Sequence, residues 1–156
     1  MGTLVGSNGG DPGDTIRKGL DGLMSRIPPA LVAGALVLEN EWKQLLLTPG
    51  LGRMYGKHRA SKPGDPPAPD MANLQRSITH DPTSETQIVV GTNVAYAPML
   101  EFGTLPRGKD NVKAGRGRLG ASLGGVAPRP HARPAFTRAA PQMTEVFGAE
   151  LKRGDR

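Results

Sequence analysis

The stretch AYAPMLEFGT, residues 95–104, concentrates large apolar side chains in a chain that has few of them. It holds Tyr96 and Phe102, two of the five Phe and Tyr residues among 156, and the acid Glu101 stands between them. No other acidic residue occurs from 86 to 109. This concentration makes the stretch the first candidate for a packing or contact surface.

The residues on either side of this stretch predict a short strand pair followed by a short helix. Two β-rich runs, 78–81 and 87–92, flank the turn signal at 81–84 and are expected to form strands. The helix is expected over residues 97–102. Gly103 ends it, because glycine readily adopts the left-handed conformation that closes many helices.

The N-terminal part is predicted to be helical after a disordered arm. Residues 1–13 are rich in glycine and show no apolar periodicity, so they are expected to be disordered. Asp14 or Thr15 can cap the segment 15–47, in which apolar residues recur at helical spacing. The prolines at 28–29 interrupt this segment, so we expect a long, kinked or broken helical hairpin arm.

The remaining segments are predicted from proline and capping signals. Residues 49–69 are expected to be loop, because their prolines lack the N–H that helices and central strands need. Asp70 can cap a short helix over 71–77. Residues 129–134 are rich in proline and are expected to be extended, so the last helix is predicted over 135–152.

Composition limits the kinds of protein this chain can be. Apolar residues make up 37% of the chain, and Gly and Pro together account for 37 of 156 residues, so we expect a modest core with long loops. There is no cysteine, which excludes disulfides and thiolate metal sites. The apolar run 30–38 is too short to span a bilayer, and the N-terminus lacks the pattern of a signal peptide. A soluble protein of a reducing compartment is therefore expected.

Positive charge is concentrated in one part of the chain. Residues 105–138 hold eight basic residues against one acid, a net charge of +7. A flexible Gly- and Arg-rich loop is expected over 104–127, and it faces solvent, a polyanion or an acidic neighbour. Its basic positions are Arg107, Lys109, Lys113, Arg116 and Arg118.

No set of residues predicts catalysis, a cofactor or a metal. The run 115–120 matches G-x-G-x-x-G, but no apolar strand precedes it, so it predicts a flexible loop rather than a dinucleotide site. His58, His80 and His131 lack the spacing of metal ligands, and we expect them to be solvated or hydrogen-bonded structural residues. The sequence therefore predicts a protein that is not an enzyme.

The order of three short runs resembles a known family. The runs are LQRSI at 74–78, GTNVAYAPMLEFGT at 91–104 and RPHARPAF at 129–136. With the long helix before them and the helix after them, they resemble the small tail-completion, or head–tail joining, proteins of long-tailed double-stranded DNA phages. This family is often labelled as minor tail components or as gene-product-ten-like. The resemblance covers roughly residues 30–152.

The chain departs from the family pattern in two places. Residues 71–73 read Met-Ala-Asn where family members commonly carry a Thr-Gly pair, and the Gly/Arg insert at 104–127 is long. The resemblance implies an α+β fold over residues 14–156, with a long helix packed on a small antiparallel sheet. It also implies no enzyme activity.

The resemblance further implies a structural virion protein, assembled in the host cytoplasm. Such a protein forms a ring at the neck, between the portal-side connector and the tail tube, with a hexamer favoured over a dodecamer. Its partners are neighbouring neck, connector, tail-tube or tail-terminator proteins, with transient contact to genomic DNA, and no membrane is involved. A tail terminator and a head-completion stopper or connector remain alternatives within this class.

Within this family the short helix is expected to anchor the sheet with one face and to meet a neighbouring subunit with the other. Glu101 is expected at the exposed end, available to an Arg of the next subunit. The candidate interface residues are Tyr96, Met99, Leu100, Glu101 and Phe102. The alternative is that the cluster is core within one chain and that Glu101 is merely solvated.

A basic DNA-binding module is the alternative from a different class. It rests on the charge of residues 105–138, which can contact phosphates in a salt-dependent way. The loop lacks interleaved aromatic residues, so base stacking is not predicted. An acidic face on an adjoining ring is slightly favoured as the partner of this loop, because DNA in a conduit has to slide.

Overall fold

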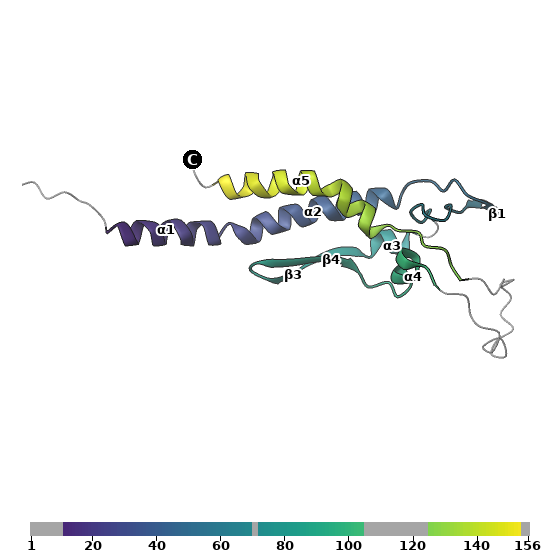
Figure 1. Ribbon diagram of the computed structural model, residues 1–156, viewed down its shortest axis with the longest axis horizontal. Helices are drawn as coiled ribbons and strands as arrows, with labels where there is room; N and C mark the ends of the chain where they lie inside the picture. The colour runs from purple at the N-terminus through teal and green to yellow at the C-terminus, as the bar shows by residue number, and fades with distance from the viewer. Residues whose placement is uncertain (1–10, 70–71, 105–124, 154–156) are drawn as a thin grey trace, which may run out of the picture.

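The computed structural model describes residues 11–69, 72–104 and 125–153, and Figure 1 shows their arrangement. The elements in chain order are α1 (Pro12–Met24), α2 (Ile27–Leu45), β1 (Met54–Tyr55), β2 (His58–Arg59), α3 (Asn73–Arg76), β3 (Ile78–Ser84), β4 (Gln87–Thr92), α4 (Ala97–Phe102) and α5 (Ala132–Lys152).

Helix α1 begins earlier than the sequence predicted. The Asp11 side chain accepts a hydrogen bond from the backbone N–H of Gly13 at 3.2 Å, which caps the helix and lets it start at Pro12. Residues 12 and 13 therefore belong to the helix and not to the predicted arm. The rest of that arm, residues 1–10, lies outside the described residues.

Helices α1 and α2 form one long bent helix. The break lies at Ser25 and Arg26, just before the predicted prolines, and Pro28 falls in the first turn of α2, where a missing N–H is tolerated. Both helices run on in the same direction in Figure 1, so the expected hairpin arm is wrong and the expected kink is confirmed. Arg26 also donates to the carbonyl of Leu151 at 3.0 Å, which ties the bend to the end of α5.

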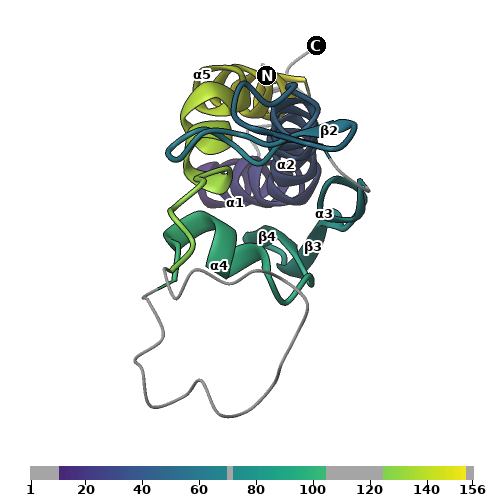
Figure 2. The ribbon, with the colours of Figure 1, turned by 90° about the vertical axis from the view of Figure 1, so that its right-hand side faces the viewer.

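Helix α2 lies at the centre of the fold. Helix α5 packs along one side of it in the opposite direction, and the β3–β4 hairpin lies along another side (Figures 1 and 2). The α+β fold, with a long bent helix on a two-stranded antiparallel sheet and a C-terminal helix, is therefore confirmed. The buried core cluster consists of Trp42, Leu45, Leu46, Leu74, Ile78, Ala97 and Ala135.

The hairpin and the preceding loop differ in detail from the prediction. Residues 81–84, predicted to form the turn, belong to strand β3, in which Pro82 lies opposite Ile88 and the register shifts between Pro82 and Ser84. The predicted loop 49–69 contains the short antiparallel pair of β1 and β2. The helix predicted over 71–77 is the shorter α3, and its predicted cap Asp70 lies outside the described residues.

Helix α5 also begins before its predicted start. The proline-rich run was expected to stay extended to residue 134, but the helix starts at Ala132 and contains Pro134 in its first turn. Proline is tolerated there because the first backbone N–H groups of a helix have no partner within the helix. The expected extension therefore holds only for the residues before His131.

The stretch Pro12–Leu45 is long and apolar enough, by length and composition alone, to cross a membrane. The apolar run 30–38 alone underestimated the length of the helix, because the helix continues through the residues on both sides of that run. Core helices of soluble proteins have the same length and composition, and α2 carries core residues such as Trp42 and Leu45. Length and composition therefore do not assign this stretch to a membrane.

Candidate functional site

Helix α4 has an inner face and an outer face. Ala97 is buried, and Leu100 is half-buried against the core cluster. Tyr96, Met99 and Phe102 are exposed, with Phe102 exposed to 72%. The predicted division into an anchored face and a free face is confirmed, with Leu100 on the anchored face. Contact of the free face with another subunit stays a prediction.

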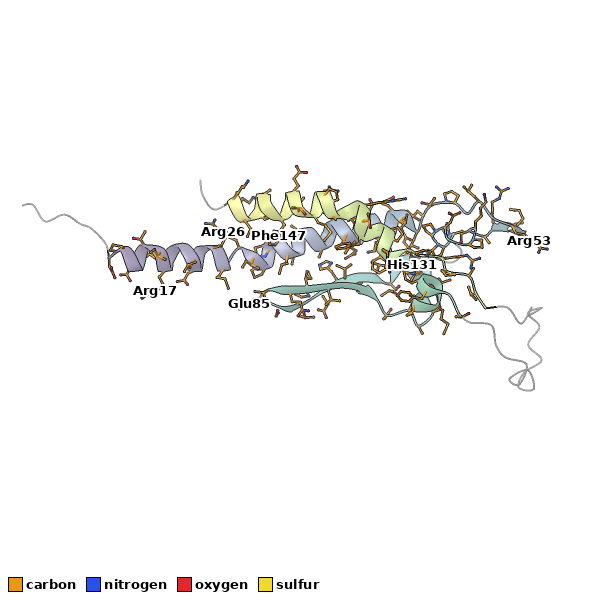
Figure 3. The ribbon with its side chains drawn as sticks, in the orientation of Figure 1. Arg17, Arg26, Arg53, Glu85, His131 and Phe147 are labelled. Carbon is orange, nitrogen blue, oxygen red and sulfur yellow. The ribbon has the colours of Figure 1, made fainter. Side chains whose placement is uncertain are left out.

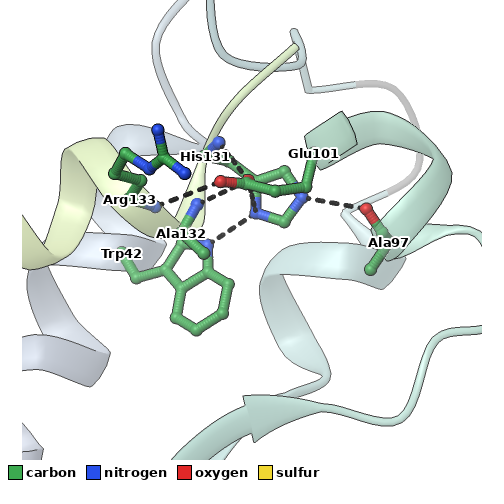
Figure 4. Close-up of polar contacts among 6 residues, drawn as sticks. All are labelled: Trp42, Ala97, Glu101, His131, Ala132 and Arg133. Atoms are coloured by element: carbon green, nitrogen blue, oxygen red, sulfur yellow. Dashed lines mark hydrogen bonds and ion pairs between the residues drawn. The ribbon is translucent and has the colours of Figure 1, made fainter. Parts of the chain in front are cut away.

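Glu101 of α4 caps the N-terminus of α5, which lies about 30 residues later in the chain. Its carboxylate accepts hydrogen bonds from the backbone N–H of His131 at 2.6 Å, of Ala132 at 2.9 Å and of Arg133 at 3.3 Å (Figure 4). No side chain at the start of α5 supplies a cap of its own. Glu101 thus satisfies N–H groups that the helix itself leaves without acceptors.

The position predicted for Glu101 is wrong. Its side chain is only 11% exposed and is committed to α5, so it is neither solvated nor available at an exposed helix end. Burial raises the pKa of Glu101, but the three N–H donors outweigh it and hold the pKa below its usual range. The carboxylate is therefore charged and acts within the chain.

His131 is buried between α2, α4 and α5. The indole N–H of Trp42 donates to His131 Nδ1 at 2.9 Å, and the two rings stack with centroids 5.6 Å apart. Because an indole nitrogen is only a donor, Nδ1 accepts, and Nε2 carries the proton directed at the carbonyl of Ala97, 3.4 Å away. Burial lowers the pKa of His131 more than the Glu101 carboxylate raises it, so the ring is held neutral.

The residues that flank the segment 105–124 are held side by side. Arg129 donates from its backbone N–H to the carbonyl of Leu100 at 2.6 Å, and the N–H of Thr104 donates to the carbonyl of Val126 at 2.9 Å. Gly103 has φ of +73°, and a Cβ there would lie 2.6 Å from the Val126 carbonyl oxygen, so only glycine fits. The five predicted basic positions Arg107, Lys109, Lys113, Arg116 and Arg118 lie outside the described residues.

An open groove of about 600 Å³ runs between α4, the end of β4 and the start of α5. Its lining is mostly apolar and includes Trp42, Val94, Pro98 and Phe102, with the capped Glu101 on its wall. Trp42, His131 and Glu101 on the wall are hydrogen-bonded to one another, so the groove offers mainly apolar contact, with Asn93 and Arg133 as further polar residues in its lining.

A second polar cluster joins α2 to β3. Glu39 accepts from His80 Nδ1 at 2.6 Å and also pairs with Lys43. Burial raises the pKa of Glu39, but the hydrogen bonds from His80 and Lys43 together outweigh burial and hold the pKa below its usual value, so the carboxylate is charged. Within the described ranges no cluster of three potential ligands is placed to hold a metal ion. The cluster around Glu39 is therefore a structural clamp.

Sequence reasoning did not find that Trp42 binds His131 or that Glu101 caps α5. His131 was expected to be either solvated or hydrogen-bonded, and the second alternative is confirmed. The signal that could have revealed the role of Glu101 is the start of α5, which has no Ser, Thr, Asp or Asn to cap it. A helix without a local cap, near a lone acid, indicates a cap supplied from another part of the chain.

Comparison with protein-family models, with curated proteins and with solved structures finds no match to this chain. The inference of its function therefore starts from its own residues and their geometry.

Proposed function

We propose that this protein is a structural subunit of the neck of a long-tailed double-stranded DNA phage. In this proposal, copies assemble head to tail into a ring that completes the tail and joins it to the DNA-filled head. No enzyme activity and no cofactor are part of the proposal. The virion, with assembly in the host cytoplasm, is the proposed location.

The way the three resembling runs meet in space is the observation that carries the proposal. Leu74 and Ile78 of the first run lie in the core cluster beside Ala97 of the second and Ala135 of the third. The second and third runs are joined directly by the hydrogen bonds of Glu101 to the start of α5. Runs that are far apart in sequence thus build one structural unit, which supports a resemblance based on their order.

The outer face of α4 supports an assembling protein. Three large side chains, Tyr96, Met99 and Phe102, are exposed next to an apolar groove. Exposed apolar patches on otherwise polar surfaces mark contact sites between proteins. A subunit of a ring buries such a patch against the next copy, and a head-to-tail contact closes a ring when its rotation fits.

The hydrogen bonds between the residues that flank the segment 105–124 bear on the role proposed for the basic loop. The hydrogen bonds of Arg129 with Leu100 and of Thr104 with Val126 hold together the residues that flank this segment. In the ring, we assign its basic residues to an acidic face of the adjoining ring, with DNA in the channel as the alternative.

The proposal is tested by the size and shape of the purified protein. Sedimentation velocity over a range of concentrations and negative-stain electron microscopy, alone and with tail components of the same phage, are expected to show closed rings. Location of the subunit at the top of the tail tube supports completion or termination, and location under the portal supports a stopper. A monomer at all concentrations, combined with normal tails when the gene is deleted, would contradict the proposal.

The DNA-binding alternative has a separate test. Binding to duplex DNA that weakens steeply with salt, and that falls when Arg116 and Arg118 are changed to Gln, would favour it. Absence of salt-sensitive binding removes it.

A further inference from the structure

Helix α1 carries an apolar face without a partner among the described residues. Ile16, Leu20 and Leu23 recur at i, i+4 and i+7 on one side of the helix, and Met24 lies beside them. Ile16 is 64% exposed and Leu20 is 57% exposed, and no residue of α1 is buried. In Figure 1 the helix extends beyond the end of α5, so the layer that covers α2 stops before it.

This helix is poorly suited to stand alone in water. It has 13 residues, three of which are glycines at positions 13, 19 and 22. Isolated helices shorter than about 12–15 residues are marginal even when rich in alanine, and each glycine costs about 1 kcal/mol relative to alanine. A helix with these properties and a regular apolar face indicates that another surface covers that face.

The end of the molecule opposite α1 carries a second exposed apolar surface. The α4 groove and the exposed face of α4 lie near His131, whereas Arg17 marks the far end on α1 (Figure 3). An amphipathic helix typically enters an apolar groove through anchors at i, i+3 or i+4, and i+7. The spacing of Ile16, Leu20 and Leu23 fits this mode.

The apolar area at the groove and on the adjoining exposed face of α4 approaches what a stable contact needs. Phe102, which lines the groove, is 72% exposed, and Tyr96 on the exposed face of α4 is 44% exposed. An aromatic side chain carries roughly 150–250 Å², so these two leave on the order of 200 Å² uncovered. A stable complex takes roughly 800 Å² from each partner, of which a little over half is apolar. Met99, which is 55% exposed, and the apolar groove lining add to this area.

We propose that α1 of one copy docks its Ile16, Leu20 and Leu23 face into the α4 groove of the next copy. The contact is head to tail, because the two surfaces lie at opposite ends of one chain, and repetition of it generates a ring or a filament. This inference rests on the proposed function and names the two surfaces that join neighbouring subunits. The outer face of α4 and the face of α1 are covered in the same contact.

Two other occupants of the α1 face fit the structure less well. Pairing of α1 with α1 of a second copy covers the helix but leaves the groove and Phe102 exposed. A membrane surface attracts helices with an excess of Lys and Arg on the polar face. In α1 the bases Arg17 and Lys18 are balanced by the acids Asp14 and Asp21.

The chain has no cysteine, so crosslinking between introduced cysteines tests the pairing directly. Leu20→Cys and Phe102→Cys proteins are mixed and treated with a short bis-maleimide crosslinker. A crosslinked dimer is expected from the mixture, and a ladder of higher species is expected when both cysteines are in one chain. Lys18→Cys, on the opposite face of α1, is the matched control and is expected to crosslink to Phe102→Cys far less.

Other crosslinking patterns overturn the pairing. Efficient crosslinking of Leu20→Cys protein with itself would assign α1 to a two-fold contact. Sedimentation of the protein with anionic vesicles, lost in Leu20→Ser, would assign α1 to a lipid surface. Closed rings without a crosslink between positions 20 and 102 would overturn this inference while leaving the proposed ring intact, and a monomer at all concentrations would overturn both.

Association is the second measurement. Leu20→Ser is expected to raise the concentration needed for assembly about tenfold or more, because a central apolar anchor is lost from the interface. Lys18→Ser, the matched change on the polar face, is expected to assemble like the unmodified protein. Equal assembly of the two variants would contradict the docking.

Discussion

The two halves of the long bent helix carry the same kind of apolar stripe, and the stripes meet opposite surroundings. In α2 the stripe includes Trp42 and Leu45, which are 7% and 3% exposed, because α5 and the hairpin cover them. In α1 the residues Ile16, Leu20 and Leu23 remain in contact with solvent. Helical periodicity therefore indicates which face of a helix seeks a partner, and it does not tell whether the same chain supplies one.

The comparison extends to the polar groups at the two ends. Around α4 a carboxylate, an imidazole and an indole are buried and hydrogen-bonded to one another. At α1 the ion pair of Arg17 with Asp14, at 3.7 Å, is exposed. Exposed pairs contribute little to stability, whereas buried polar groups cost a great deal when a partner is lost. The α4 end is therefore expected to determine the stability of the fold.

The largest difference is expected between Trp42→Ala and Leu20→Ala. Trp42→Ala leaves a cavity in the core and removes the donor to His131, so it is expected to lower the free energy of unfolding by about 3–5 kcal/mol. Leu20→Ala at the α1 end is expected to change it by less than about 0.5 kcal/mol in dilute monomer. Urea unfolding followed by circular dichroism measures both. Similar losses in the two variants would show that α1 is part of the cooperative core.

An intermediate effect is expected for Glu101→Ala. Loss of the carboxylate leaves backbone N–H groups at the start of α5 without an acceptor and is expected to cost about 2 kcal/mol in the same unfolding experiment. Asp14→Ala in α1 is the matched control and is expected to stay within about 0.5 kcal/mol. If Glu101→Ala unfolds at the same urea concentration as the control, water replaces the carboxylate and the cap is dispensable.

The smallest effect is expected from pH and concerns His131 at the α4 end. Because the pKa of His131 is lower in the fold than its ordinary 6.5, the unfolded chain binds more protons below that value. The stability linked to His131 is thus present above pH 6.5 and is lost as pH falls below 6.5 and through the lower pKa of the folded state. The pKa values of Glu39 and Glu101 lie below their ordinary 4.5, so these two carboxylates stay charged just below pH 6.5.

The variant His131→Asn separates this effect from that of other groups. It is expected to be less stable than the unmodified protein at pH 7.5 and to lose less stability on acidification. An unchanged dependence of stability on pH in His131→Asn would assign the effect to another titrating residue.

Most elements of the fold could be predicted from the sequence, and the errors lie at their ends. The apolar spacing predicted both long helices, and the β-branched run Ile88–Val90 predicted a strand that the structure confirms. The helix start at Pro12 was missed because the Gly-rich residues 1–13 show no apolar periodicity. The start at Ala132 was missed because proline was taken to exclude helix, although the first turn accepts it. Short hydrogen-bonded pairs such as β1 and β2 have no periodicity long enough to detect.

The candidate site was predicted only in part. The two faces of α4 follow from residues that are neighbours in sequence, and Tyr96, Met99 and Phe102 are exposed as the helix pattern requires. The partner of Glu101 could not be found in this way. A carboxylate near apolar residues fits an exposed helix end equally well, and the N–H groups that it binds belong to a distant part of the chain.

The sequence by itself determined the helical and strand segments, the turn at Gly103 and the absence of cysteine chemistry, because these depend on residues that are close along the chain. Only the tertiary structure decided that Glu101 caps α5, that Trp42 binds His131 and that the stripe of α1 is left uncovered. The physical reason is that burial and hydrogen-bond partnership depend on distances in space. Local patterns specify which groups need a partner, and packing specifies which of them find one.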